Sequence, residues 1–316
     1  MPKLLITRNL PETVLDAARE RFDVEVRTET KPMTVGEARA ALWVYDAILP
    51  TLGDGFREGA FDEPPRTRIL ANFGVGYNHI DVPAARAVGI EVTNTPGAVT
   101  DATADIAMTL ILMTCRRAGE GERLVRADKW EGWHPTQLLG MHVTGKTLGV
   151  VGMGRIGKAI ARRAQGGFGM KIVFHNRSKV DDPGVEAVQM DTLAEVMAAA
   201  DIVVLAVPAT SETKHLIDAG ALEAMKPTGV LVNISRGDVV DEAWLIRALG
   251  EGTIAGAGLD VYEFEPKVPD ALKRMENVTL LPHLGTAALE VREAMGLMAV
   301  ENLIAVFDGR PAPNPV

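Results

Sequence analysis

The sequence has a single cysteine, Cys115, among its 316 residues. One cysteine excludes an intrachain disulfide, and this composition is typical of proteins from a reducing compartment. Aromatic residues are also scarce, at 5%, and the 33 lysines and arginines are outnumbered by 42 aspartates and glutamates. Because the basic residues are scattered and the net charge is −9, nucleic acid and anionic membrane surfaces are poor candidate partners.

Long hydrophobic runs are missing as well. No stretch approaches the roughly 20 apolar residues that span a bilayer, and the apolar part of Met1 to Arg8 is too short for a signal peptide. That stretch predicts a first strand instead, and we expect a cytoplasmic protein. What is present is the composition of an ordinary globular chain, with 47% hydrophobic residues and enough length for two domains.

A glycine-rich turn near the middle of the chain carries the most chemical information. An apolar run, Leu148 to Val151, predicts a buried strand that ends at Gly152, and Gly154 and Gly157 follow ahead of good helix formers. In dinucleotide sites the first such glycine permits the turn, the second lets the pyrophosphate approach, and the third lets helix and strand pack. The pyrophosphate then lies at the positive end of the helix. The flanking strand and helix make the motif more specific than the glycines alone.

Strands and helices alternate on both sides of this turn, which predicts two doubly wound parallel sheets. Before it, strands are predicted at 3–7, 24–26, 47–49, 68–72 and 90–94, with helices after Pro11 and Thr34. After it, strands are predicted at 171–175, 201–207, 229–234, 255–260 and 278–281, with helices at 193–199, 222–225, 242–249 and 287–307. The longest helical pattern, 101–117 with Thr100 or Asp101 as its cap, is expected to bridge two domains.

We therefore expect a flavodoxin-like substrate domain of residues 1–99 and 288–316, and a Rossmann dinucleotide-binding domain of residues 100–287. The first unit is short, so the C-terminal helical run is expected to return to it. Its loop 72–78 follows a strand end, where sheets of this class bind ligands.

The segment Asn176-Arg177-Ser178 bears on the choice of cofactor. Folds that bind NAD usually place an Asp or Glu about 20 residues after the glycines, on the ribose 2′-hydroxyl, whereas here no carboxylate stands before Asp181. Arg177 offers a fork of N–H donors to a 2′-phosphate, and Ser178 offers a hydroxyl. The sequence thus favours NADPH as the cofactor, and NAD(H) stays possible. The alternative to phosphate binding is that Arg177 is simply solvated in a polar loop.

An arginine, a carboxylate and a histidine stand at three predicted strand ends: Arg236, Glu265 and His283. Arg236 presents a planar fork to a carboxylate and a keto oxygen. His283 is of the type that titrates near neutral pH and can protonate an incipient alkoxide, while the cofactor supplies a hydride. Glu265, if it accepts a hydrogen bond from the imidazole, would orient the ring and favour its protonated form. Each of the three residues alone could have a purely structural role, but their joint placement favours reduction of a 2-keto acid.

With these motifs in this order, the chain resembles the D-isomer-specific 2-hydroxyacid dehydrogenases, and within them the glyoxylate/hydroxypyruvate reductases. The resemblance covers nearly the whole chain and implies the roles given above for Arg236, Glu265 and His283. It also implies that the backbone N–H groups of Val75 and Gly76 bind the substrate carboxylate. The family's NAD-dependent members carry Asp where this chain has Asn176. The expected cofactor-binding residues are Thr103, Gly152, Gly154, Arg155, Ile156, Gly157, Asn176, Arg177, Ser178, Val207, Pro208, Ile234, Ser235, Asp260, His283 and Gly285.

The resemblance further implies a homodimer, with an arm near Trp130 reaching across so that Trp133 closes the neighbour's substrate pocket. Simple packing of these aromatics at the interface is the alternative. The leading hypothesis is NADPH-dependent reduction of glyoxylate and hydroxypyruvate, without a metal ion. A reductase of a larger or sugar-derived 2-keto acid, such as 2-ketogluconate, and a dinucleotide-sensing protein without turnover are the competing hypotheses. The loop 51–54 has no signature that decides among the keto acids.

Overall fold

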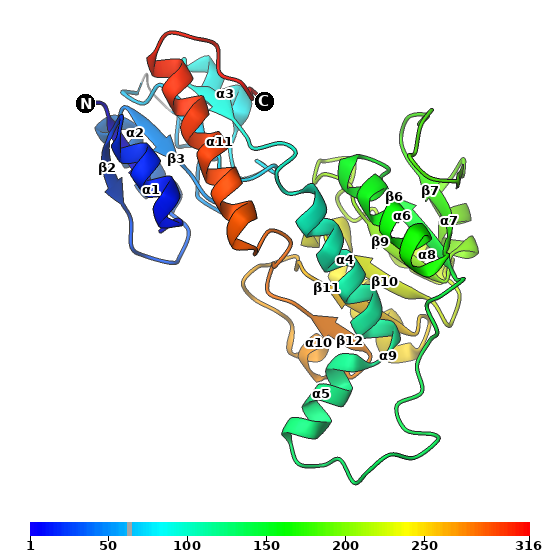
Figure 1. The fold of residues 1–316 in the computed structure, drawn as a ribbon. Helices are drawn as coiled ribbons and strands as arrows, with labels where there is room; N and C mark the ends of the chain where they lie inside the picture. Colours follow the sequence, from blue (N-terminus) through cyan, green and yellow to red (C-terminus); the bar gives the residue numbers. More distant parts are fainter. Residues whose placement is uncertain (62–64) are drawn as a thin grey trace. The chain divides into compact units, whose positions relative to one another are not determined.

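The computed structural model describes residues 1–61 and 65–316, which form two compact units (Figure 1). One unit comprises residues 1–99 and 286–316, and the other comprises residues 100–285. The second unit ends at Gly285, slightly before the expected boundary at residue 287. Gly285 N donates to Asp260 Oδ2 at 2.8 Å inside the second unit, whereas Thr286 O accepts from Arg292 Nε at 2.9 Å in the first unit. The two hydrogen bonds account for the position of the division.

The described residues of the first unit form a five-stranded parallel sheet in the order β2-β1-β3-β4-β5. This is the flavodoxin-like order, which was predicted. The strands are β1 (Lys3–Ile6), β2 (Asp23–Val26), β3 (Ala47–Leu49), β4 (Ile69–Ala71) and β5 (Glu91–Thr93). The helices are α1 (Glu12–Arg19), α2 (Val35–Val44), α3 (Val82–Ala87) and α11 (Leu289–Phe307).

Local signals set the starts of two of these helices. Pro11 stands immediately before α1, and Thr34 caps α2 through a reciprocal pair of hydrogen bonds with Glu37. The C-terminal helix α11 lies beside α1 (Figure 1). A Cβ on Gly296 would stand 2.4 Å from a methyl group of Val14, so the lack of a side chain lets α11 approach α1 closely.

The described residues of the second unit form a seven-stranded parallel sheet in the order β12-β11-β10-β9-β6-β7-β8. Counted from β6, its first six strands follow the Rossmann order 3-2-1-4-5-6, and β12 extends one edge. The strands are β6 (Thr147–Val151), β7 (Lys171–His175), β8 (Ala187–Gln189), β9 (Ile202–Leu205), β10 (Val230–Asn233), β11 (Gly256–Leu259) and β12 (Val278–Leu280). The helices are α4 (Thr100–Cys115), α5 (Ala118–Arg126), α6 (Arg155–Phe168), α7 (Leu193–Ala199), α8 (Ala219–Glu223), α9 (Glu242–Glu251) and α10 (Asp270–Arg274), with a 3₁₀ turn η1 (Gly237–Val239).

Helices cover both faces of this sheet, and the strands alternate between them. Ile202 and Val204 pack under α4 and α6, whereas Val203 and Leu205 pack under α7, α8 and α9. Cys115, the last residue of α4, lies in the core, and burial raises the pKa of its thiol to about 12. A thiol of that kind stays protonated and is not a reactive nucleophile. Among the helices of the described residues, none is long and apolar enough to cross a membrane.

The long helix departs from its prediction at both ends. α4 begins at Thr100, so Thr100 and Asp101 lie in its first turn instead of capping it. It ends at Cys115, because Arg117 takes a left-handed conformation with φ of 53° and starts the separate helix α5. The sequence analysis did not predict α5. Although α5 is amphipathic, none of its residues, all of which the structure describes, is buried.

Candidate active site

The glycine turn after β6 has a distinct steric reason for each glycine. Gly152 has φ of 97°, and a Cβ there would stand 2.7 Å from Ala206 O. A Cβ on Gly157 would stand 2.1 Å from Gly152 O, so the third glycine lets α6 cross the strand end closely. Around Gly154, in contrast, no described atom lies within 4 Å of such a Cβ. The turn is closed at its first and third glycines and open at its second.

The open side of the turn meets the N-terminus of α6. Gly154 is the N-cap and supplies no side-chain cap, and no acceptor among the described residues meets the backbone N–H of Arg155 or Ile156. Free N–H groups and the helix dipole together make an anion site. The residues present therefore fit the pyrophosphate of a dinucleotide.

The segment after β7 connects to this turn through a side chain. Asn176 Oδ1 accepts from Met153 N at 3.2 Å, and Asn176 Nδ2 donates to Ser178 O at 3.0 Å. Arg177 points into solvent with 88% of its side chain exposed, and its Nη1 contacts Glu212 Oε2 at 2.7 Å. An exposed ion pair of this kind contributes little free energy. The Arg177 guanidinium can therefore exchange Glu212 for a stronger anion at little cost.

Glu265 and His283 are in direct contact. His283 Nδ1 lies 2.9 Å from Glu265 Oε2, and Glu265 Oε1 accepts from Tyr262 N at 3.1 Å. Burial raises the pKa of Glu265, but the hydrogen bond and charge of His283, the Tyr262 N–H and the charge of Arg236 outweigh it and leave that pKa below its usual range. His283 itself adopts a left-handed backbone, with φ of 57°, and its N donates to Asp260 O at 2.9 Å. The pair is thus a carboxylate that holds one imidazole nitrogen.

This lowered pKa implies a pH dependence of stability. A carboxyl group with a lower pKa in the folded chain adds stability above its unfolded value, about 4.3 for glutamate. That stability is lost as pH falls through the folded pKa. We expect Glu265→Gln to have a smaller free energy of unfolding than wild type near neutral pH, and the difference to shrink below about pH 4. Urea denaturation at a series of pH values measures it, and a difference that grew on acidification would contradict the assignment.

Arg236 follows β10 and is oriented by a buried asparagine. Asn233 Nδ2 donates to Arg236 O at 2.9 Å, and Asn233 Oδ1 accepts from Ser235 N at 3.0 Å. Arg236 Nη1 donates to Ser235 O at 2.7 Å, while its Nε is buried and has no hydrogen-bond partner among the described residues. Burial lowers the pKa of Arg236, and the nearby charges of Glu265 and Asp238 oppose that shift. A desolvated guanidinium with a free donor is suited to an anionic ligand.

Asn233 is a residue that the sequence analysis quoted in a motif but did not assign. Its side chain binds its own backbone two and three residues further on, the local turn for which asparagine is favoured. The short spacing from Asn233 to Arg236 at a strand end was the available signal.

Residues from three elements meet around Asp260, at the end of β11. Asp260 is 1% exposed and accepts from Leu284 N at 2.6 Å and from Gly285 N at 2.8 Å. Thr103 Oγ1, from α4, donates to Gly285 O at 3.1 Å. Burial raises the pKa of Asp260, and the two backbone N–H groups oppose that shift. Asp260 thus fastens the segment that carries His283, and Thr103 and Gly285 lie beside it.

The other expected cofactor residues follow β9 and β10. Val207 lies against the glycine turn, where its Cγ1 would stand 2.8 Å from a Cβ on Gly152. Pro208 O accepts from Thr213 Oγ1 at 2.7 Å, and Ile234 is 6% exposed. All of these positions are at the carboxyl edge of the second sheet, where Arg236 and the segment of Glu265 also begin.

In the first unit, Val75 and Gly76 lie in the loop after β4. Asn72 Nδ2 donates to Gly74 O at 3.0 Å and to Gly76 O at 3.1 Å, and Asn94 Nδ2 donates to Val75 O at 2.9 Å. Three successive carbonyl groups are thus satisfied by asparagine amides. Over the part of the chain that the structure describes, no acceptor meets the N–H of Val75 or Gly76. Two adjacent N–H donors are left for a ligand.

The segment after α5 presents aromatic side chains to solvent. Trp133 is 80% exposed and Trp130 is 54% exposed. Trp130 Nε1 reaches Gln137 Oε1 at 3.4 Å, a long hydrogen bond within the same segment. Figure 1 shows α5 and this segment extending from the rest of the second unit. The arm formed by residues 118–141 therefore leaves apolar surface uncovered.

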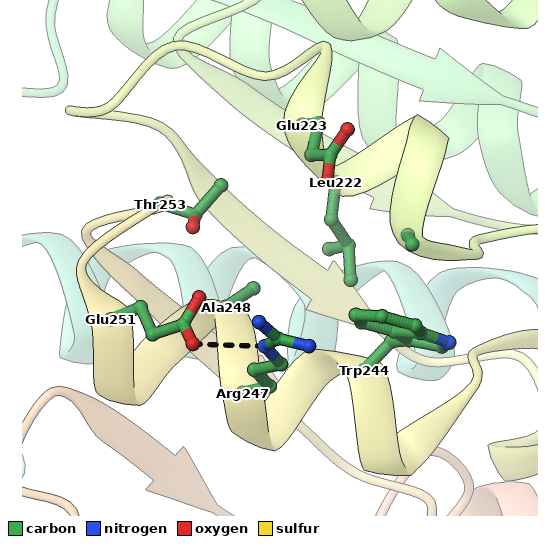
Figure 2. Close-up of a pocket in the computed structure, with 8 residues that line it drawn as sticks. Leu222, Glu223, Trp244, Arg247, Ala248, Glu251 and Thr253 are labelled. Carbon is green, nitrogen blue, oxygen red and sulfur yellow. Dashed lines mark hydrogen bonds and ion pairs between the residues drawn. The ribbon is translucent and has the colours of Figure 1, made fainter.

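A pocket of about 150 Å³ lies between α8 and α9, away from these positions (Figure 2). Arg247 Nε contacts Glu251 Oε1 at 2.8 Å, and the guanidinium lies 5.1 Å from the centre of the Trp244 ring. The described residues that line it are Ala219, Leu222, Glu223, Trp244, Arg247, Ala248, Glu251 and Thr253, none of them an expected site residue. The hollow is a feature of the outer face of α9.

Known proteins share both the sequence and the fold. Residues 108–285 match the family model described as "D-isomer specific 2-hydroxyacid dehydrogenase, NAD binding domain". The chain is 45% identical over 320 residues to the glyoxylate reductase of Thermococcus gammatolerans, covering 100% of this chain and 96% of the relative. The chain belongs to the D-isomer specific 2-hydroxyacid dehydrogenase family. The expected resemblance to this family and to its glyoxylate reductases is confirmed, and the protein is an NAD(P)-dependent oxidoreductase of 2-keto acids.

Further relatives of this dehydrogenase agree with the assignment. The glyoxylate reductase of Pyrococcus furiosus is 44% identical over 320 residues, covering 100% of this chain and 95% of the relative. The solved NADPH-dependent glyoxylate/hydroxypyruvate reductase of Sinorhizobium meliloti, in complex with NADP and malonate, is 39% identical with a TM-score of 0.87. That comparison covers 100% of this chain and 96% of the other. A nicotinamide dinucleotide is accordingly the cofactor of this enzyme.

Proposed function

We propose that this dehydrogenase reduces small 2-keto acids, glyoxylate and hydroxypyruvate, to D-2-hydroxy acids, with NADPH as the preferred cofactor. One observation carries the proposal: His283 Nδ1 is held by Glu265 at 2.9 Å, and the charge of Glu265 also acts on Arg236, whose buried Nε has no partner among the described residues. A proton donor and a free cationic donor are thus coupled through one carboxylate. The names of the relatives support the choice of substrate, since several are glyoxylate reductases.

In the proposed mechanism, the substrate's negative groups are bound before any proton moves. The N–H groups of Val75 and Gly76 bind the carboxylate, because their carbonyl groups already have partners, whereas their N–H groups have none in the described part of the chain. The Arg236 fork binds the carboxylate and the keto oxygen, and stabilises the negative charge that develops on that oxygen. Arg236 therefore both orients the substrate and polarises its carbonyl.

The proton comes from His283. Glu265 occupies Nδ1, so Nε2 is the nitrogen left to protonate the keto oxygen. The carboxylate also fixes the orientation of the imidazole ring for this step. A bound nicotinamide supplies the hydride that completes the reduction.

The cofactor-binding residues are assigned to the parts of the dinucleotide by their positions. Gly154 and the N–H groups of Arg155 and Ile156 suit the pyrophosphate, and Asp260 and Thr103 suit the carboxamide end. Arg177 and Ser178 suit a 2′-phosphate, and the absence of a carboxylate at position 176 supports NADPH over NADH. NADH is retained as a second, weaker cofactor.

Arg177→Ala tests the cofactor assignment. A charge-assisted hydrogen bond contributes about 1.5–3 kcal/mol, so kcat/KM with NADPH is expected to fall about tenfold or more, while kcat/KM with NADH changes little. Glu212→Gln is the companion variant, because it frees the guanidinium of its partner and is expected to maintain or raise the preference for NADPH. Equal losses with the two cofactors would remove Arg177 from phosphate recognition.

A panel of 2-keto acids, assayed with each reduced cofactor, tests the function itself. We expect the highest kcat/KM for glyoxylate and hydroxypyruvate with NADPH. A clear preference for 2-ketogluconate would indicate a reductase of sugar-derived acids instead. Nucleotide binding without turnover of any acid would indicate a dinucleotide-sensing protein.

We also propose that the enzyme is a homodimer that works in the cytoplasm. The exposed Trp130 and Trp133, on an arm whose helix α5 buries none of its described residues, support a partner that covers them. In this arrangement Trp133 closes the neighbour's substrate pocket or packs at the interface beside it. A monomeric mass in sedimentation equilibrium would contradict the dimer. The single buried cysteine supports a reducing compartment.

A further inference from the structure

A histidine and three carboxylates form a cluster outside the residues used above. His215 Nε2 lies 2.8 Å from Glu263 Oε1, and His215 Nδ1 lies 3.7 Å from Asp241 Oδ2. The third carboxylate is Glu242, which is 6% exposed and begins the buried side of α9. We call residues 260–266 the catalytic loop, since Glu265 lies in it.

His215 is held in an unusual conformation by backbone hydrogen bonds. Its φ is 51°, a left-handed value that is uncommon for residues other than glycine and asparagine. Its N donates to Asp238 O at 2.8 Å, and the next pair of bonds joins Ile217 N to Val239 O and Asp241 N to Ile217 O, each at 3.0 Å. The segment of His215 is thereby fastened along the stretch that follows Arg236.

Glu263 is the residue at which three segments meet. Its side chain contacts His215, its N lies 3.4 Å from Glu242 Oε2, and its Oε2 lies 3.5 Å from Glu242 N. Beside it, a Cβ on Gly237 would stand 1.8 Å from the carbonyl carbon of Tyr262, so the backbone after Arg236 lies directly on the catalytic loop. A shift of Glu263 would therefore change the contacts of both the His215 segment and the backbone after Arg236.

The catalytic loop also contacts the segments of Glu265 and His283, which form the catalytic pair. Tyr262 Oη donates to Leu281 O at 2.8 Å, just before His283, and Tyr262 N donates to Glu265 Oε1 at 3.1 Å. Glu263 follows Tyr262 directly. Glu263 thus adjoins a residue that contacts both the Glu265 carboxylate and the backbone shortly before His283.

We propose that His215 and Glu263 are positioning residues, whose contact holds the catalytic loop so that Glu265 meets His283 and the backbone after Arg236 stays in place. The inference rests on the proposed roles of Arg236, Glu265 and His283. Geometry gives the reason for a histidine here: its two ring nitrogens reach two carboxylates, with Nε2 2.8 Å from Glu263 and Nδ1 3.7 Å from Asp241. Glu242 and Glu263 are themselves adjacent carboxylates. Burial, together with the charge of Glu263, raises the pKa of Glu242, which agrees with this crowding of acids.

The contact also connects two functional regions of the second unit. The segment that ends at His215 begins at Pro208, after the strand end expected to line the cofactor, and contains Glu212, the partner of Arg177. Thr213 ties it together, since its Oγ1 donates to Pro208 O at 2.7 Å. The His215–Glu263 contact joins this cofactor-side segment to the catalytic loop.

Variants of both residues test the proposal. His215→Asn keeps a residue type that tolerates the left-handed backbone but removes the reach to Glu263. Glu263→Ala removes the acceptor, and Glu263→Gln keeps an acceptor of the same shape. We expect His215→Asn and Glu263→Ala to lower kcat about tenfold, within the cost of up to about 10²-fold for a 1 Å misplacement, with KM for NADPH little changed. Glu263→Gln is expected to retain most of the activity.

Two readouts separate positioning from a general loss of stability. The first is the split between the kinetic constants: a misplaced Glu265 lowers kcat, whereas KM for NADPH is expected to stay near the wild-type value. The double variant His215→Asn/Glu263→Ala is expected to be no slower than the slower single variant, since the two act through one contact. Arg247→Gln is the matched control: it removes the exposed ion pair to Glu251 on the outer face of the same helix α9 (Figure 2) and is expected to behave as wild type.

Two results would overturn the proposal. One is kcat within about twofold of wild type in both His215→Asn and Glu263→Ala, against the loss expected from misplacement. The other is a loss of activity that follows thermal stability alone, with Glu263→Gln as slow as Glu263→Ala. Either result leaves the proposed function intact as long as His283→Ala abolishes 2-keto acid reduction. If His215→Asn does not fold, the comparison of Glu263→Ala with Glu263→Gln decides the question.

Discussion

Replacement of His283 by alanine is expected to lower kcat for 2-keto acid reduction by about 10²–10⁴-fold, the usual contribution of general acid–base catalysis. The imidazole is the proton donor in the proposed mechanism, and Glu265 leaves its Nε2 free for that role. Steady-state assays with glyoxylate and saturating NADPH measure the effect.

The controls for this variant concern folding and cofactor binding. The His283 side chain is 28% exposed, so its removal creates no large cavity, and the dissociation constant for NADPH is expected to stay close to the wild-type value. A variant that folds, binds NADPH and reduces glyoxylate within about twofold of wild type would rule out the proton-donor role, given the factor that such catalysis contributes.

Arg236→Gln is expected to separate activity from stability. Loss of one member of a buried, hydrogen-bonded charge pair costs about 2–5 kcal/mol, so kcat/KM should fall about 10²–10³-fold. The free protein carries the desolvated guanidinium without a hydrogen-bond partner for Nε among the described residues, which disfavours the folded state. We therefore expect the thermal midpoint of Arg236→Gln to equal or exceed that of wild type, as is common when a strained functional group is removed.

Steady-state kinetics and calorimetry on one preparation check both parts. Rescue of glyoxylate reduction by added guanidinium would strengthen the assignment. A fall in activity that accompanies an equal fall in thermal stability would show that Arg236 supports the fold instead of the substrate.

The elements that the sequence predicted best have signals within a few neighbouring residues. The strand, three glycines and helix of residues 148–164 are one such case, and the helix predicted after Thr34 is another. The misplaced elements depended on distant contacts or on a single backbone angle. α4 ends at Cys115 because Arg117 adopts a left-handed conformation, and no residue type in that stretch signals it. The short strand β8 exists because it pairs with β7.

The residues of the candidate site also fall into those with a local sequence signal and those without one. Arg236, Glu265 and His283 were predicted as site residues because each residue type has a recognisable chemistry at a strand end, and in the structure Glu265 Oε2 lies 2.9 Å from His283 Nδ1. Asn233, His215 and Glu263, which contact the segments of these residues, were not predicted as site residues. Asn233 left a weak local signal, whereas the contact of His215 with Glu263 spans 48 positions and has none.

The sequence by itself determined the family, the two parallel sheets and the residue types available for hydride and proton chemistry. These properties follow from secondary-structure propensity, hydrophobic periodicity and sequence motifs, all of which depend on residues close together in the chain. Only the tertiary structure decided which side chains meet, because parallel strands bring residues from distant positions to one edge. It alone showed that Nε of Arg236 is buried without a partner among the described residues, and that Glu263 contacts His215.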